Sequence, residues 1–101
     1  SLKADMTIEE IVKKVSEISS VSEKEIVGKS RKMEIAQARQ VSMFLSREIL
    51  GKSLSGIGMY FGGRDHTTVM HAIKTISEKV DTDDVISNTI SKLRTDLNQS
   101  F

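Results

Sequence analysis

The sequence predicts an all-α domain of six helices, and three observations support this fold class. Apolar residues recur at i, i+3, i+4 and i+7 in several segments, which is the spacing of an amphipathic helix. No segment alternates between apolar and polar residues as a half-buried strand does. The 101 residues contain no proline, so capping residues and glycines must separate the helices. We expect a helix-turn-helix, at about 54–61 and 66–80, packed on a long central helix.

Composition limits the classes of protein. Hydrophobic residues make up 38% and charged residues 29% of the chain, as in an ordinary globular domain. No apolar run approaches the roughly 20 residues of a membrane span, and no basic-then-apolar leader predicts export. The absence of cysteine excludes disulfides and thiolate metal sites, which fits the cytoplasm. Residues 1–6 are expected to be a linker remnant of a longer protein, and residues 7–101 form the predicted domain.

Capping boxes predict the first two helices, from Ile8 to Ile18 and from Glu23 to Val27. In each, a Ser or Thr N-cap stands three residues before a Glu, and an apolar pair flanks the cap as a hydrophobic staple. These pairs are Thr7 with Glu10 and Met6 with Ile11, then Ser22 with Glu25 and Val21 with Ile26. Gly28 is expected to stop the second helix.

A long third helix is predicted from Met33 to Leu50, with Gly51 ending it. Its main apolar stripe consists of Ile35, Ala38, Val41 or Ser42, Leu45 and Ile49, and Met43 and Phe44 are also expected in the core. Gln40 and Arg47 lie seven residues apart on another face, about 10 Å along the axis. They suit two phosphate contacts, or an ordinary solvent-exposed face.

The predicted helix-turn-helix begins at Ser53, an N-cap for a short helix from Leu54 to Phe61. Gly58 within it is expected to permit close approach of a neighbouring helix. Gly62 and Gly63 suit a reversal that needs positive φ. Asp65 is expected to cap the next helix by accepting from the N–H of Thr67 or Thr68.

The second helix of this unit and the last helix are both amphipathic. In the former, the apolar stripe consists of Val69, Ala72, Ile73, Ile76 and Val80. The polar stripe consists of Thr67, Thr68, His71, Lys74 and Thr75. The last helix is predicted from about Asp83 to Asn98 with Ile86, Ile90, Leu93 and Leu97 inward. Asp81 is expected to cap it, with Val80 and Val85 as the staple.

Charge is distributed unevenly along the chain. Residues 24–52 contain seven basic residues against three glutamates, a net charge of +4, whereas the flanking parts are slightly acidic. Such a basic segment indicates a phosphate-contacting surface, or a solvated charged face. The loop Lys29-Ser30-Arg31-Lys32 could insert an arginine into a minor groove, or stay solvated. A helix with a buried stripe and a polar first turn is typical of a major-groove reader.

Metal and enzyme chemistry find little support in the sequence. His66 and His71 are five residues apart and diverge by roughly 140° around a helix axis, so they cannot chelate one ion as an i, i+4 pair does. No nucleophile elbow accompanies the serines, which are explained by their capping roles. Two function classes remain: a sequence-specific DNA-binding module and a helical protein-interaction module. The second requires a sizeable exposed apolar patch, for which the sequence shows no spare stripe.

The residues from Gly62 to Ala72 resemble the signature of the C-terminal DNA-binding domain of the bacterial replication-initiator family DnaA. Ala38-Arg39-Gln40 with Met43 and Leu45 resembles the long helix of that family, and residues 53–61 resemble its first helix-turn-helix helix. In all, residues 7–98 fit the six-helix layout of the family. Ala38, Ser55 and Gly56 depart from its commonest pattern, in which Pro, Pro and Glu are frequent at these positions.

The resemblance implies binding to short, asymmetric, A·T-containing boxes of double-stranded DNA at the replication origin. It assigns Arg31 to the minor groove, and Leu54 and Ser55 to thymine methyls or sugar. The residues that it assigns to the major groove are Arg64, Asp65, His66, Thr67 and Thr68. It assigns phosphates to Lys29, Arg39, Gln40, Arg47, Thr68 and His71. Asp65 then has two candidate roles, as a base contact and as a helix cap.

The resemblance also implies what the chain lacks. The ATPase domain of the family has no counterpart in this sequence, so we expect no enzyme activity and no cofactor, with ATP binding only in the part of the parent protein outside this chain. The expected location is the cytoplasm, at the bacterial nucleoid, without membrane association. The domain is expected to be monomeric, with a regulatory protein as a further candidate partner.

Overall fold

The structure, a computed structural model, describes residues 6–99 and is all-helical over that range. Its elements are α1 (Ile8–Ser19), α2 (Glu23–Val27), α3 (Met33–Leu50), α4 (Leu54–Tyr60), α5 (His66–Thr82) and α6 (Asp84–Gln99). The predicted fold class and helix order are therefore confirmed. Residues 1–5 of the predicted linker lie outside the described residues, whereas Met6 is buried and belongs to the domain. None of these helices is long and apolar enough to cross a bilayer.

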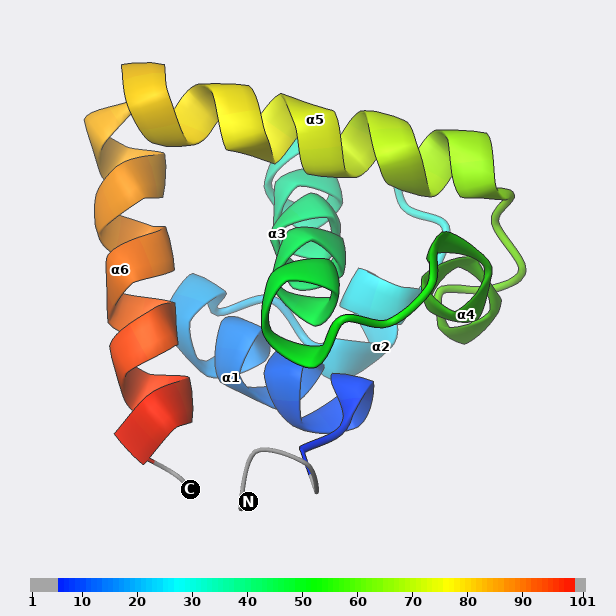
Figure 1. The fold of residues 1–101 in the computed structure, drawn as a ribbon, viewed down its shortest axis with the longest axis horizontal. Helices are drawn as coiled ribbons and strands as arrows, with labels where there is room; N and C mark the ends of the chain where they lie inside the picture. Colours follow the sequence, from blue (N-terminus) through cyan, green and yellow to red (C-terminus); the bar gives the residue numbers. More distant parts are fainter. Residues whose placement is uncertain (1–5, 100–101) are drawn as a thin grey trace.

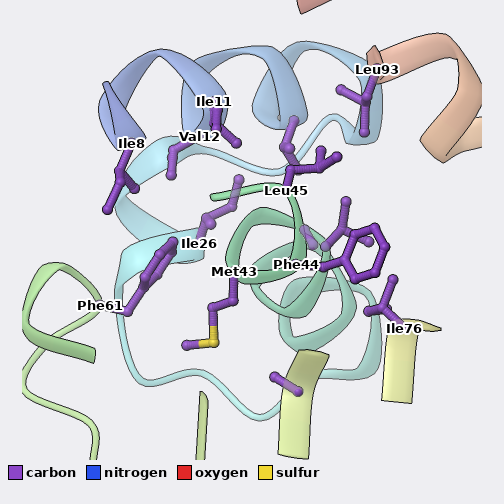
Figure 2. Close-up of a cluster of buried hydrophobic side chains, with 14 of the residues drawn as sticks. Ile8, Ile11, Val12, Ile26, Met43, Phe44, Leu45, Phe61, Ile76 and Leu93 are labelled. Carbon is purple, nitrogen blue, oxygen red and sulfur yellow. The ribbon is translucent and has the colours of Figure 1, made fainter. Parts of the chain in front are cut away.

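Helix α3 is the central element of the fold. It makes its most extensive contacts with α5 on one side and α1 on the other, and Figure 1 shows it nearly end-on between these two helices. Figure 2 shows the core at this junction, with Met43 and Leu45 of α3 among side chains from α1, α2 and the end of α4. Because α3 packs on both sides, nine of its residues between Ile35 and Ser46 are buried. The long helix therefore fixes where α5 lies relative to α1 and α2.

Local capping explains why the first helices begin where they do. Both predicted capping boxes are present: the Thr7 hydroxyl accepts from the N–H of Glu10, and the Ser22 hydroxyl accepts from the N–H of Glu25. The staple residues on either side of each cap are buried, as predicted. Gly51 ends α3 with a φ of 64°, in the left-handed region that favours glycine. Ser20 ends α1 in the same region without being a glycine, a feature the sequence did not indicate.

The junction of α5 and α6 differs from the prediction. Helix α5 continues to Thr82, so Asp81 lies within it. The cap of α6 is Asp83, whose Oδ1 accepts from the N–H groups of Val85 at 3.0 Å and Ile86 at 3.2 Å. Val85 is 72% exposed and makes no staple. Because Asp83 satisfies the first donors of α6, the reversal needs no earlier cap, and α5 extends beyond Val80.

Candidate nucleic-acid interface

The turn between α4 and α5 is built by glycines. Gly62 and Gly63 have φ values of 84° and 78°, as predicted from their sequence. The Gly58 carbonyl accepts from the N–H groups of Gly63 and Arg64, both at 3.0 Å. A Cβ at Gly58 would come within 3.0 Å of the Arg64 carbonyl oxygen, so only glycine fits. Gly58 therefore allows close approach of the turn and, through Val69 Cγ2 at 3.5 Å, of the neighbouring helix α5, as the sequence suggested.

Asp65 is the N-cap of α5. Its Oδ1 accepts from the N–H of Thr68 at 2.9 Å, which confirms the predicted capping role. This bond to the Thr68 backbone lowers the pKa of Asp65 from its ordinary value, so the carboxylate is charged at neutral pH. Hydrogen bonding to the Thr68 hydroxyl and to the Thr67 backbone lowers the pKa in the same direction. The side chain is exposed, so the cap leaves a charged carboxylate at the surface beside the first turn of α5.

Arg64 joins the turn to the basic loop, residues 29–32. Its Nη2 donates to the Gly28 carbonyl at 2.7 Å, and its Nη1 donates to the Phe61 carbonyl. The residue is partly buried. The guanidinium is therefore directed at the backbone ahead of the loop, whereas the resemblance assigned Arg64 to the major groove.

Arg39 lies in the interior of the molecule. It is 7% exposed, and its Nε, Nη1 and Nη2 donate to the carbonyls of Ile26 at 2.7 Å, Ser30 at 2.9 Å and Glu25 at 3.0 Å. Burial, and secondarily the positive charge of Arg64, lowers the pKa of the Arg39 guanidinium. Arg39 thus holds the segment that leads into the basic loop, a role distinct from the phosphate contact that the resemblance implied.

The remaining predicted residues lie at the surface. The first two turns of α5 expose His66, Thr67, Thr68 and His71. On α3, Gln40 is partly buried and Arg47 is exposed, with the Arg47 Nη1 donating to the Lys52 carbonyl at 2.8 Å. On α4, Leu54 is partly buried and Ser55 is exposed. Lys29 and Arg31 are exposed in the basic loop.

Two adjoining hollows bring many of these side chains together. The larger, about 490 Å³, lies between the basic loop, α3 and the turn, and is lined by Lys29, Ser30, Arg31, Ala36, Arg39, Gly62, Arg64 and Thr68. The smaller, about 120 Å³, lies between α3 and α5 and shares four of these residues. It adds Gln40, Met43, His71 and Ala72. Arg47, Leu54, Ser55, Asp65, His66 and Thr67 line neither hollow.

The larger hollow is electropositive. Four of its eight lining residues are Lys or Arg, and none is acidic. Ala36, in the first turn of α3, also lines the hollow, and this helix N-terminus has no side-chain cap, so the positive end of its dipole adds to the same field. Among residues 6–99 no group of three or more His, Asp or Glu is arranged to hold a metal ion. The arrangement suits binding of an anion, such as a phosphate, more than metal chemistry.

The hydrogen bonds from Arg39 and Arg64 to backbone carbonyls were not predicted from the sequence. One signal for Arg39 was present: it lies four residues after Ile35 and four before Met43, both of which were expected in the core. A cation on that stripe needs buried acceptors. Arg64 carries no such local signal, since its partner Gly28 lies 36 residues away in the chain.

Comparison with known proteins finds a matching family model and relatives that all point to one family. Residues 8–76 match the family model of the bacterial DnaA protein helix-turn-helix. The chromosomal replication initiator protein DnaA of Chlorobaculum tepidum is 43% identical over 89 residues, which cover 88% of this chain and 18% of that protein. The DnaA of Lactococcus lactis subsp. cremoris is 44% identical over 91 residues, covering 90% and 20%.

A crystal structure of a DNA replication initiation factor has the same fold, with a TM-score of 0.79 at 28% identity over 88% of this chain and 27% of that one. The chain spans about a fifth of the length of the curated relatives it matches. The family model covers well over half of the chain, and it includes the α4–turn–α5 unit described above. The chain therefore belongs to the bacterial DnaA helix-turn-helix family.

Proposed function

We propose that this chain is a sequence-specific binder of double-stranded DNA that recognises replication-origin boxes. In this proposal α5 enters the major groove, and the basic loop reaches the adjacent minor groove. The chain is the DNA-binding part of a replication initiator that acts at the bacterial nucleoid. It needs no cofactor of its own, and it binds as a monomer to an asymmetric site.

One observation supports this proposal above the others: the basic loop and the start of α5 lie against the same hollow. Lys29 and Arg31 line it from the loop, and Thr68 lines it from α5. The Arg64 side chain links the two segments directly through the Gly28 carbonyl. A duplex presents a minor groove and a major groove side by side across one sugar–phosphate strand. Two reading elements on either side of a cationic hollow match that arrangement.

The exposed first turns of α5 carry suitable chemistry for reading bases. Threonine offers a hydroxyl to a base or phosphate and a methyl to thymine, and the exposed carboxylate of Asp65 can accept from cytosine N4. His66 and Thr67 are fully at the surface beside it. In this proposal Lys29, Arg47 and His71 donate to phosphates around them, and such contacts fix orientation without reading sequence.

The alternative, a protein-interaction module, finds less support. The large apolar side chains exposed in residues 6–99 are Met33, Met59, Met70 and Val85. They come from four different helices, α3, α4, α5 and α6. An interaction surface of that kind needs a contiguous apolar patch.

A titration with fluorescent duplexes tests the proposal. Duplexes selected from a random pool should bind more tightly than scrambled duplexes of the same composition. With about six phosphate contacts, the affinity should fall on the order of a thousandfold between 50 and 200 mM salt. Equal affinity for selected and scrambled duplexes would contradict the proposed sequence specificity. An affinity that does not change with salt would contradict the proposed phosphate contacts, and with them the DNA-binding function. A stoichiometry of one chain per site tests the monomer.

A further inference from the structure

We infer that Arg39 and Arg64 are positioning residues, which hold the basic loop at a fixed place relative to α5 and do not themselves bind DNA. The consequence for DNA affinity depends on the proposed function. The consequence for loop order does not, because it concerns only the free protein.

Arg39 fixes the start of the loop from α3. Its planar guanidinium reaches three carbonyls at once, two in α2 and one at Ser30 within the loop. All three lie within hydrogen-bonding distance of one rigid fork, so Ser30 cannot shift without breaking a bond to the same group that anchors Glu25 and Ile26. The loop is thus tied to the central helix by a side chain that leaves α3 in the middle of its buried face.

Arg64 fixes the same segment from the other side. Its Nη2 bond to the Gly28 carbonyl crosses from the helix-turn-helix turn to the residue before Lys29. Its Nη1 bond to Phe61 holds the guanidinium within its own turn. Because Asp65, the next residue, is the N-cap of α5, a displacement of Gly28 is transmitted to the start of that helix. The two arginines therefore bracket residues 28–30 between α3 and α5.

The charge on these arginines needs a separate explanation. Neither has a carboxylate within ion-pair distance among residues 6–99, and both line the same acid-free hollow. Burying an unpaired cation is costly, and a neutral amide could donate to a carbonyl at lower cost. Arginine nevertheless serves here, because only its fork spans several acceptors at once, three at Arg39 and two at Arg64. Its uncompensated charge adds to the field of Lys29 and Arg31.

Limited proteolysis with trypsin tests the positioning role without DNA. Arg39→Lys and Arg64→Lys keep the charge, but a lysine ammonium places its donors at one point and cannot span the carbonyls. Cleavage after Lys29, Arg31 and Lys32, measured by mass spectrometry relative to cleavage after exposed Lys52, should rise about tenfold in each variant. Arg94→Lys is the matched control, because Arg94 bridges to Glu48 and touches neither the loop nor the turn. It should leave the ratio unchanged.

A double-mutant cycle in the DNA titration tests whether Arg39 acts through the loop. Arg31→Ala is measured in the wild-type chain and in Arg39→Lys, with the folded fraction of each variant checked by circular dichroism. If Arg39 positions Arg31, the loss of affinity caused by Arg31→Ala should be at least threefold smaller in the Arg39→Lys background. Equal losses in both backgrounds would show that Arg31 contributes independently of Arg39, which overturns the inference.

The two arms separate this inference from the proposed function. If neither the wild type nor any variant binds duplexes specifically, the proposed function fails. Increased cleavage of the loop in Arg39→Lys and Arg64→Lys would still establish the positioning role. If cleavage in Arg39→Lys and Arg64→Lys matches the Arg94→Lys control, the arginines do not hold the loop. The inference then fails whatever the DNA result.

Discussion

Replacing Gly58 with alanine places a methyl group where the helix-turn-helix turn passes closest to α4. That methyl would lie within 3.0 Å of the Arg64 carbonyl oxygen, 3.1 Å from its carbonyl carbon and 3.5 Å from Val69 Cγ2. The first two contacts are with backbone, which cannot move aside as a flexible side-chain end does. The turn must therefore shift away from α4, and the two hydrogen bonds accepted by the Gly58 carbonyl weaken or break.

The expected destabilisation combines three effects. Overpacking costs about 1–3 kcal/mol, and two backbone hydrogen bonds contribute about 0.5–1.5 kcal/mol each. Alanine returns about 1 kcal/mol through its better helix propensity. The net loss in the free energy of unfolding is about 3 kcal/mol, within a range of about 1–5. For a domain of this size the melting temperature should fall by about 15 °C.

Urea and thermal unfolding followed by circular dichroism at pH 7 measure this loss. Gly56→Ala is the matched control, since Gly56 lies in the same helix, is exposed, and would place its Cβ 3.1 Å from a side-chain atom, the Ser53 cap hydroxyl, and not against backbone. We expect that control to stay within about 1 kcal/mol of the wild type, because the helix propensity of alanine offsets any strain on the cap. If Gly58→Ala proved as stable as Gly56→Ala, the steric reasoning about the turn would be refuted.

The remaining predictions concern caps, an ion pair and the interface. Asp83→Ala should lower stability by about 1 kcal/mol, whereas Asp81→Ala should not, as thermal melts of the two variants will reveal. Asp65→Ala should lower the melting temperature at pH 7, and Asp65→Asn, which also caps, much less. Because the pKa of folded Asp65 is depressed, the stabilisation by its charge is present above the unfolded pKa and is lost as the pH falls through the folded pKa. The difference in melting temperature between the wild type and Asp65→Ala should therefore shrink below about pH 4. A difference that persists at low pH would show that the charge is irrelevant. Arg94→Ala, which removes a half-exposed bidentate pair with Glu48, should cost less than about 1 kcal/mol, and less still in high salt. Arg31→Ala should weaken binding chiefly to duplexes with a narrow A·T minor groove, with Lys13→Ala as an exposed cation on α1 that leaves binding unchanged.

The sequence predicts the fold well where local chemistry sets it. The capping boxes at Thr7 and Ser22 and the left-handed stop at Gly51 depend on residues within one turn, so the starts of α1 and α2 and the end of α3 follow directly. The end of α5 does not follow in this way, because Asp81 and Asp83 are both suitable cap residues by type, and the structure uses Asp83. The tasks of Arg39 and Arg64 could not be predicted, since their acceptors are carbonyls that carry no side-chain signal and lie far away in the chain.

The acceptors used by Arg39 and Arg64 are main-chain oxygens, and every amino acid supplies the same oxygen. The side chains at positions 29–31 can therefore be exchanged while the backbone that carries them keeps its anchorage. A library randomised at Lys29 and Arg31 should accordingly yield folded proteins with altered groove preferences, so this part of the molecule offers a scaffold for retargeting.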